Sequence, residues 1–378
     1  MAGGVNRKIA AASARAHTRR AKKSTSFQLP PGMMKKALVL FFVGILAWAY
    51  KAIQPPPSKI CGSPDGPPVT ATRIKLVDGR HLAYREDGVS KDTAKHKIVF
   101  VHGFDSSRHH SLANFLSLEF FEELGVYIVS FDRPGYGESD PNPKRTVKSM
   151  ALDIEELADQ LGLGPKFYVV GFSMGGQVLW SCLKYIPHRL AGAVLIAPAI
   201  NYWWTRFPAN ISNEGFNQQL WSDRWSLRVA HHAPWLTYWW NTQKLFSSFK
   251  AAARSVDIFS SQDTEILKSL NASQLAVAYM EQIRQQGECE SIHRDMNVAF
   301  GKWEFSPVEL ENPFPNNEGF VHIWQGDEDK LVPVIMQRHI AKQLPWIHYH
   351  ELTGSGHMIP LAQGMSDAIF KELLIGKK

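Results

Sequence analysis

A Gly-x-Ser-x-Gly motif at residues 171–175 constrains the fold of this 378-residue chain more than any other feature. A strand-favouring run at 168–170 precedes the motif, and a helix-compatible segment at 177–184 follows it. A strand that turns straight into a helix leaves no room for side chains beside the central serine, which explains Gly171 and Gly175. The order strand, motif, helix therefore predicts that Ser173 is strained and exposed above a buried sheet.

Short apolar runs alternate with helical patterns along most of the chain. This alternation predicts an α/β fold with a mostly parallel, eight-stranded sheet and helices on both faces. A hairpin around Asp78-Gly79 supplies the first two strands. The other strands are expected at 97–101, 126–131, 167–170, 193–197, 320–324 and 346–350. Helical spacing covers 112–124 and 147–161.

The strand–helix rhythm breaks between residues 201 and 307. Seven of the twelve tryptophans fall within 203–240, and helical segments are expected at 264–270 and 274–285. An aromatic insertion after the sixth strand predicts a helical cap over the carboxyl edge of the sheet. Most of these aromatic side chains are expected to pack the cap's own small core, and some to line an apolar substrate pocket.

The first 36 residues form a basic arm with nine Lys or Arg residues and no Asp or Glu. Subtracting nine from the net charge of +7 leaves −2 for the rest of the chain, which is therefore close to neutral. A nearly neutral folded part does not indicate a nucleic-acid-binding surface. The arm at 1–36 is predicted to be disordered or to be a targeting segment.

An uncharged apolar stretch at 37–50 follows the arm and is flanked by lysines. Fourteen helical residues span about 21 Å, less than the ~30 Å of a bilayer core, but the flanking lysines can extend the span. Residues 37–53 are therefore predicted to be a membrane anchor. A cleaved targeting sequence and a buried core helix are the alternatives.

The positive flank predicts a cytosolic N-terminus and a folded part across the membrane, in the endoplasmic reticulum or endomembrane system. A plastid location, or secretion after cleavage, is the alternative. Asn-x-Ser sequons at Asn210 and Asn271 fit a luminal domain. Residues 54–70 are predicted to be a Pro/Gly linker to a core at 71–200 and 308–378, interrupted by the cap at 201–307. Three cysteines are too few for a disulfide framework.

A serine hydroxyl needs a histidine base, and the histidine needs a carboxylate that fixes its tautomer. Loops after the last two predicted strands supply these groups in the order serine, acid, histidine. The loop at 326–333 contains Asp327 and Asp329, and the loop at 354–357 ends at His357. Because the carboxyl ends of parallel strands meet at one edge, both loops are expected to converge on Ser173.

Five motifs make the chain from about residue 72 resemble the α/β-hydrolase superfamily, in its cap-bearing esterase and lipase-like branch. They are His-Gly-Phe at 102–104, Asp-Arg-Pro-Gly-Tyr-Gly-Glu-Ser at 132–139, Gly-Phe-Ser-Met-Gly-Gly at 171–176, Gly-Asp-Glu-Asp-Lys-Leu-Val-Pro at 326–333 and Gly-Ser-Gly-His at 354–357. The resemblance implies that Ser173 is the nucleophile, Asp329 the acid and His357 the base. Asp327 is the alternative acid, or else it caps the turn.

The resemblance also implies an oxyanion hole made by the backbone N–H groups of Phe104 and Met174. His102 is expected to orient its own loop by hydrogen bonding. Asp132 and Arg133 are expected to hold the loop after the fourth strand. No cofactor and no metal are predicted, because neighbouring histidines such as 109–110 and 231–232 point different ways and lack the spacing of zinc ligands.

These features together predict a serine hydrolase that cleaves a carboxylic ester with an apolar acyl or aromatic part through an acyl-enzyme. A serine at this turn argues against the dehalogenase and epoxide-hydrolase branches, which use an aspartate. Acyl transfer to an alcohol needs the same triad and is the first alternative. A ligand-sensing receptor on the same fold is the second. The predicted partners are a small ester and a membrane, with no prediction of oligomeric state.

Overall fold

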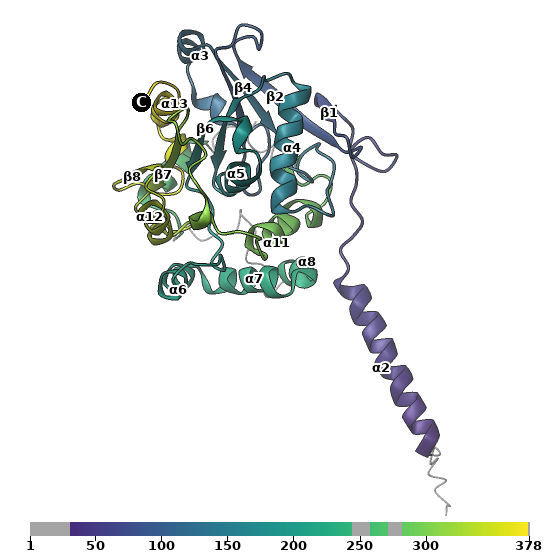
Figure 1. Ribbon diagram of the computed structural model, residues 1–378. Coiled ribbons are helices and arrows are strands. Elements are labelled where there is room, and N and C mark those ends of the chain that lie inside the picture. The colour runs from purple at the N-terminus through teal and green to yellow at the C-terminus, as the bar shows by residue number, and fades with distance from the viewer. Residues whose placement is uncertain (1–30, 244–257, 271–281, 377–378) are drawn as a thin grey trace, which may run out of the picture. The chain divides into compact units, whose positions relative to one another are not determined.

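The computed structural model describes residues 31–243, 258–270 and 282–376. The chain divides into two units, one ending at Ala52 and one running from Ile53 to Lys378. The second unit contains an eight-stranded sheet in the order β1-β2-β4-β3-β5-β6-β7-β8 (Figure 1). Its strands are β1 Arg73–Lys75, β2 His81–Gly88, β3 His96–Val101, β4 Val126–Phe131, β5 Phe167–Phe172, β6 Leu190–Ile196, β7 Val321–Gly326 and β8 Ile347–Leu352.

The sheet confirms the predicted strands and hairpin. β1 pairs antiparallel with β2, and β2 pairs antiparallel with β4, whereas every other neighbouring pair is parallel. Val99 and Val101 of β3 face one hydrophobic cluster, while Ile98 and Phe100 face the other. Successive side chains of a strand point to opposite faces, so a sheet covered on both sides needs such continuous apolar runs.

Helices cover both faces of the sheet (Figure 1). On one face α4 (Val147–Gln160), α5 (Met174–Tyr185) and α12 (Val334–Gln343) contribute to the larger cluster. On the other face α3 (Leu118–Leu124) and α13 (Met365–Ile375) contribute to the smaller one. The parallel strands therefore end at one shared edge, and the loops that leave that edge carry the site.

The expectation of one helix over 112–124 is wrong. The structure has a 3-10 turn at Leu112–Phe115 and then α3. Ser117 between them is extended, with φ −77° and ψ 157°, and its hydroxyl accepts a hydrogen bond from the backbone N–H of Phe120. A serine in this role starts a new helix, because its side chain replaces the missing carbonyl partner of the first turn.

The inserted region after β6 is helical, as predicted. Its described elements are α6 Ala209–Asn217, α7 Trp221–His232, η3 Pro234–Leu236, α8 Thr237–Thr242, α9 Ser261–Leu270, η6 Cys289–His293 and α11 Arg294–Phe300. α7 packs against α8 and α11, and α6 packs against α12 of the core (Figure 1). The helix expected at 274–285 lies mostly outside the described residues.

The seven tryptophans at 203–240 differ in exposure: one is buried, three are exposed, and Trp203, Trp239 and Trp240 are partly buried. Trp204 is 4% exposed and belongs to the main hydrophobic cluster. Trp221, Trp225 and Trp235 are 61%, 40% and 64% exposed. The predicted packing in a core of the cap therefore does not hold for these three side chains, and Trp204 packs in a cluster that the cap shares with the core.

The N-terminal unit contains one described helix, α2, at Pro31–Ile53. It starts earlier than predicted, so residues 31–36 belong to the helix rather than to the basic arm. Pro31 fits this start, because the first helical residue needs no N–H partner. The helix has 23 residues, which span about 34 Å, enough for a ~30 Å bilayer core. Within the described residues it is the one helix that is long and apolar enough to cross a membrane.

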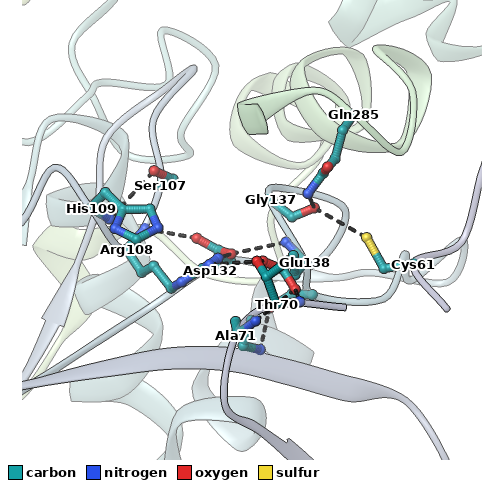
Figure 2. A network of polar contacts seen from close by, with 12 residues as sticks. Cys61, Thr70, Ala71, Ser107, Arg108, His109, Asp132, Gly137, Glu138 and Gln285 are labelled. Carbon is teal, nitrogen blue, oxygen red and sulfur yellow. Dashed lines mark hydrogen bonds and ion pairs between the residues drawn. The ribbon is translucent and has the colours of Figure 1, made fainter. Parts of the chain in front are cut away.

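Part of the predicted linker at 54–70 is bonded to the loop after β4 (Figure 2). The N–H and hydroxyl of Thr70 both donate to Glu138 over 2.7 Å. Arg108 donates to the same carboxylate over 2.9 Å and also pairs with the buried Asp132. The Cys61 thiol lies 3.8 Å from a carbonyl oxygen of this loop. This network joins the chain leaving the N-terminal unit to a loop that borders the site.

Candidate active site

Ser173 lies at the turn between β5 and α5. Its backbone has φ 55° and ψ −118°, a conformation that is rare for a residue with a side chain. A Cβ on Gly171 would lie 2.5 Å from the carbonyl oxygen of Gly175, and a Cβ on Gly175 would lie 2.0 Å from that of Val101. The two glycines therefore allow the close packing that forces the serine into this strained turn.

The structure brings Ser173, His357 and Asp329 into one chain of hydrogen bonds. The Oγ of Ser173 is 2.9 Å from Nε2 of His357, and Nδ1 of His357 is 2.7 Å from Oδ2 of Asp329. Because an ionised carboxylate only accepts hydrogen bonds, Nδ1 of a neutral His357 carries the proton, and Nε2 has a free electron pair toward the serine hydroxyl. This tautomer is the one that can take the serine proton.

The two acids that the sequence left open have different partners. Asp329 follows β7, is 4% exposed and binds His357. Asp327 accepts a hydrogen bond from the backbone N–H of Gly354 over 2.7 Å and so connects the loops after β7 and β8. Asp327 makes a turn contact of the kind expected for an Asx residue, and of the two acids it is Asp329 that contacts the histidine.

Further donors fix the Asp329 carboxylate. Its Oδ1 accepts from the backbone N–H groups of Leu331 and Val332 over 2.9 and 2.8 Å. Its Oδ2 accepts from the side-chain amide of Gln325 over 3.0 Å, in addition to His357. With both oxygens occupied, the carboxylate is held in one orientation toward the imidazole.

The loop after β3 lies beside the serine. A Cβ on Gly103 would be 3.4 Å from the Cβ of Ser173, so the backbone that leads to Phe104 passes close to this serine. Met174 is the first residue of α5, and the N–H groups of a first helical turn have no partner inside the helix. Both predicted oxyanion-hole residues therefore lie next to Ser173.

His102 holds this loop from inside. Its Nε2 accepts from the backbone N–H of Arg133 over 3.0 Å, so Nδ1 carries the proton and donates to the carbonyl of Gly103 over 2.8 Å. Burial, followed by the nearby Arg133 guanidinium, lowers the pKa of His102 well below its ordinary value. The ring is thus a neutral structural element that joins the loops after β3 and β4.

A buried ionic cluster that sequence reasoning missed joins the cap to the core. Arg133 donates to Asp295 of α11 over 2.7 Å and to the carbonyl of Gly103 over 2.8 Å. The hydroxyl of Tyr136 donates to Asp295 over 2.9 Å. Burial raises the pKa of Asp295, but the Arg133 and Arg145 guanidinium groups hold it below its ordinary value. Arg133 pairs with a cap residue, not only with its own loop.

Two clefts involve residues from the start of the cap. One, of about 340 Å³, is lined by aromatic residues including Tyr202, Trp203 and Phe216 and by polar ones including Asn213 and Arg228, and none of Ser173, Asp329 and His357 lines it. The other, of about 640 Å³, is lined by Asp329 together with Leu220, Ile258 and their neighbours. Burial and the Asp329 carboxylate raise the pKa of Tyr202, which places this aromatic residue near the triad acid.

One group in the described residues could hold a metal ion, and it lies away from the triad. One ligand atom from each of His322, His350 and Glu372 lies within 4.8 Å of the others. Nδ1 of His322 is 3.0 Å from Nε2 of His350, a distance that a hydrogen bond between the rings explains. His322 is near the start of β7, whereas Asp329 follows its end. His231 of one neighbouring-histidine pair donates from Nδ1 to the carbonyl oxygen of Phe300 over 2.6 Å and stacks on Trp203.

The fold and these contacts define an α/β-hydrolase with a Ser–His–Asp arrangement at the carboxyl edge of its sheet. Residues 98–369 match the model of the alpha/beta hydrolase family, and the chain belongs to that family. The esterase EaEST from Exiguobacterium antarcticum shares the fold, with a TM-score of 0.53 and 16% identity over 80% of this chain and 99% of that one. A carboxylesterase structure from the thaumarchaeon Nitrososphaera gargenis gives a TM-score of 0.51 at 13% identity, over 81% and 98% of the two chains.

The sequence relatives match a smaller share of this chain than the solved structures do. A dihydrolipoyllysine-residue acetyltransferase component of an acetoin cleaving system from Cupriavidus necator is 29% identical over 151 residues, 39% of this chain and 37% of the relative. The Arabidopsis thaliana protein named "Probable lysophospholipase BODYGUARD 4" is 22% identical over 299 residues, 75% of this chain and 66% of the relative. The matched segments span 37% and 42% of the first two curated relatives, so these matches support the shared hydrolase core rather than a shared substrate.

Proposed function

We propose that this protein is a membrane-anchored serine hydrolase that cleaves a carboxylic ester with an apolar acyl or aromatic part. The observation that carries the proposal is the hydrogen-bonded chain from Ser173 through His357 to the buried Asp329. Its esterase-like structural neighbours are consistent with this chemistry.

The proposed mechanism follows from the tautomer of His357. Nε2 takes the proton of Ser173 while Oγ attacks the ester carbonyl, and the N–H groups of Phe104 and Met174 stabilise the negative charge on the carbonyl oxygen. The imidazolium, oriented by Asp329, then gives its proton to the leaving alcohol, and an acyl-enzyme remains. Water deprotonated by His357 attacks this ester and releases the acid, which restores the free serine.

The substrate class rests on the aromatic cleft at the base of the cap. Its five tryptophan, tyrosine and phenylalanine residues favour an apolar acyl chain or an aromatic group, because such side chains bury large apolar areas, while Ser212, Asn213, Arg228 and His232 add polar groups to the same lining. The name of the Arabidopsis relative points to a lysophospholipid, which also carries an ester with an apolar acyl chain.

The test is covalent labelling of the full chain in detergent with a fluorophosphonate probe, compared with Ser173→Ala. We expect labelling of the wild type and none of the variant, and hydrolysis of p-nitrophenyl esters that falls by at least about 10⁴-fold in the variant. Hydroxylamine, which competes with water for an acyl-enzyme, should yield the hydroxamate. A folded wild type that neither labels nor hydrolyses any ester would contradict the proposal and favour a ligand-binding role.

We propose that α2 is retained as the anchor, with the basic arm in the cytosol and the folded part across an endoplasmic reticulum or endomembrane bilayer. The length and composition of α2 and the nine cationic residues of the arm support this orientation. Carbonate extraction of cells that express the full chain should leave the protein in the membrane pellet. A soluble product that begins beyond residue 50 would instead identify α2 as a cleaved signal.

A further inference from the structure

Asp263 lies at the start of α9 in the cap and is 1% exposed. It forms a reciprocal pair of hydrogen bonds with the residue three positions earlier. The N–H of Asp263 donates to Oγ of Ser260 over 3.0 Å, and the N–H of Ser260 donates to Oδ2 of Asp263 over 3.2 Å. This is the capping box that begins many helices. Helix capping alone explains only the hydrogen bond that Oδ2 of Asp263 accepts from the N–H of Ser260.

The same carboxylate accepts two more hydrogen bonds from the loop that carries His357. The backbone N–H of His357 donates to Oδ2 of Asp263 over 2.9 Å, and the N–H of Met358 donates to Oδ1 over 2.6 Å. Hydrogen bonds to a carboxylate are about twice as strong as those between neutral groups. The cap thus holds the backbone of His357, while Asp329 of the core holds its ring.

Packing around Gly356 shows how closely the two segments meet. A Cβ at this glycine would lie 1.9 Å from Oδ2 of Asp263 and 2.3 Å from Oγ of Ser260. The carboxylate occupies the space that a side chain would fill, so the loop and the start of α9 fit together only with glycine at 356.

We propose that Asp263 is a positioning residue that aligns His357 for proton transfer, so that the cap helps to assemble the catalytic site. This inference rests on the proposed serine hydrolase activity. The 2.9 Å contact between Ser173 and His357 depends on where the histidine backbone lies, and a displacement of about 1 Å in such a site costs on the order of 10²-fold in rate.

The first test is Asp263→Asn in the full chain, assayed with a p-nitrophenyl ester after titration of active sites with a fluorophosphonate. An asparagine has one acceptor oxygen and one NH₂ donor, so either His357 or Met358 then faces a donor instead of an acceptor. We expect kcat per titrated site to fall by about 10- to 100-fold, with KM within about twofold of the wild type.

The matched control is Asp153→Asn. Asp153 of α4 is also buried, with 4% of its surface exposed. Its carboxylate accepts two hydrogen bonds from Arg80, over 2.7 and 3.1 Å, and it does not contact Ser173, His357 or Asp329. This variant should unfold at a lower temperature but keep its kcat per titrated site. If Asp263→Asn behaves in the same way, losing only thermal stability or the fraction of titratable sites, then Asp263 is structural and the proposal is wrong.

A double-mutant cycle gives an independent test. The cycle is run in a Ser260→Ala background, because a methyl group at position 356 would also meet Oγ of Ser260. There, Gly356→Ala should reduce kcat per titrated site, because the new methyl group displaces the carboxylate of Asp263. In an Asp263→Ala background that carboxylate is absent, and the further effect of Gly356→Ala should be at least about threefold smaller. Equal effects in both backgrounds would contradict a role through Asp263. An unlabelled, inactive wild type would overturn the proposed function and this inference together, whereas an active wild type with an unaltered Asp263→Asn would overturn this inference alone.

Discussion

The sheet core and the cap differ in where their large apolar side chains lie. In the core, every residue of β4 and β7 is buried, the polar Ser130, His322 and Gln325 included, and the apolar residues of these strands contribute to clusters on both faces. In the cap, α7 buries Asp223 and Ser226 beside its apolar residues, while Trp221 and Trp225 are exposed. The strands therefore keep their apolar residues inside, and α7 departs from this pattern.

The two regions share the main hydrophobic cluster, and buried charged contacts join them as well. Asp263 and Asp295 of the cap bind backbone or charged groups of the core loops, and Arg284 binds Asp105, the residue after Phe104. Hydrophobic burial is non-directional and tolerates small shifts, but buried charged contacts require each partner in place. In the proposed mechanism the groups that react come from the core, and the proposed role of the cap is to contribute contacts that fix where they lie.

The largest effect should come from the core itself. Asp329→Asn should lower kcat by about 10⁴-fold, because an amide no longer fixes the His357 tautomer. Asp327→Asn should change kcat by no more than about threefold, because Asp327 contacts the backbone of Gly354 and not His357. Measuring kcat for both variants with one ester decides between the two acids, and the reverse ranking would assign the role to Asp327.

Breaking the ion pairs between the cap and the core should lower the free energy of unfolding. Asp295→Asn leaves the buried Arg133 and Arg145 without their carboxylate, and we expect a loss of about 3–5 kcal/mol in the free energy of unfolding. The control is Glu309→Gln, which removes the partner of the largely exposed Arg206 and should cost about 0–1 kcal/mol. Similar losses in chemical denaturation would mean that the cap does not depend on its buried ion pairs.

A smaller effect is expected at the oxyanion side of the site. Arg284→Gln removes two hydrogen bonds, of 2.6 and 2.5 Å, to Asp105. Because Asp105 is adjacent to the predicted oxyanion donor Phe104, kcat per titrated site should fall about tenfold. Arg338→Gln, which removes a similar pair of bonds to Glu351 on the exposed side of the core, should leave kcat unchanged. Equal kcat values for the two variants would show that Arg284 does not support the oxyanion side of the site.

The pH dependence of stability gives a further comparison of the two regions. Burial lowers the pKa of His322 in the core to about 3 and that of His293 in the cap to about 4, from 6.5. Below pH 6.5 the unfolded chain binds a proton that each folded histidine excludes, so stability falls as pH is lowered toward the folded pKa. Each histidine contributes up to about 1.4 kcal/mol per pH unit in this range.

Urea unfolding between pH 7.5 and 4.5 should therefore have a shallower pH slope in His322→Gln and in His293→Gln than in the wild type. A separate early transition at low pH that only His293→Gln suppresses would show that the cap opens before the core. A slope that neither variant changes would contradict the buried, neutral state of both rings.

The sequence alone determined the fold class, the strands and the motifs of the candidate site. Apolar runs and helical spacing are local signals, and a Gly-x-Ser-x-Gly turn between a strand and a helix permits few backbone conformations. The order of the motifs along the chain gave Ser173 and His357, and the family resemblance favoured Asp329 while Asp327 stayed open as the acid. The tertiary structure placed Asp329 2.7 Å from His357, and His357 2.9 Å from Ser173.

Only the tertiary structure decided how the cap meets the core. Asp263 and Asp295 carry no periodic signal, and they contact residues 94 and 162 positions away in the chain. The break at Ser117 and the early start of α2 at Pro31 also depend on local hydrogen bonding and capping that apolar spacing does not report. Patterning encodes which face of an element is buried, but directional contacts between charged groups depend on how the elements dock, and docking is a property of the whole fold.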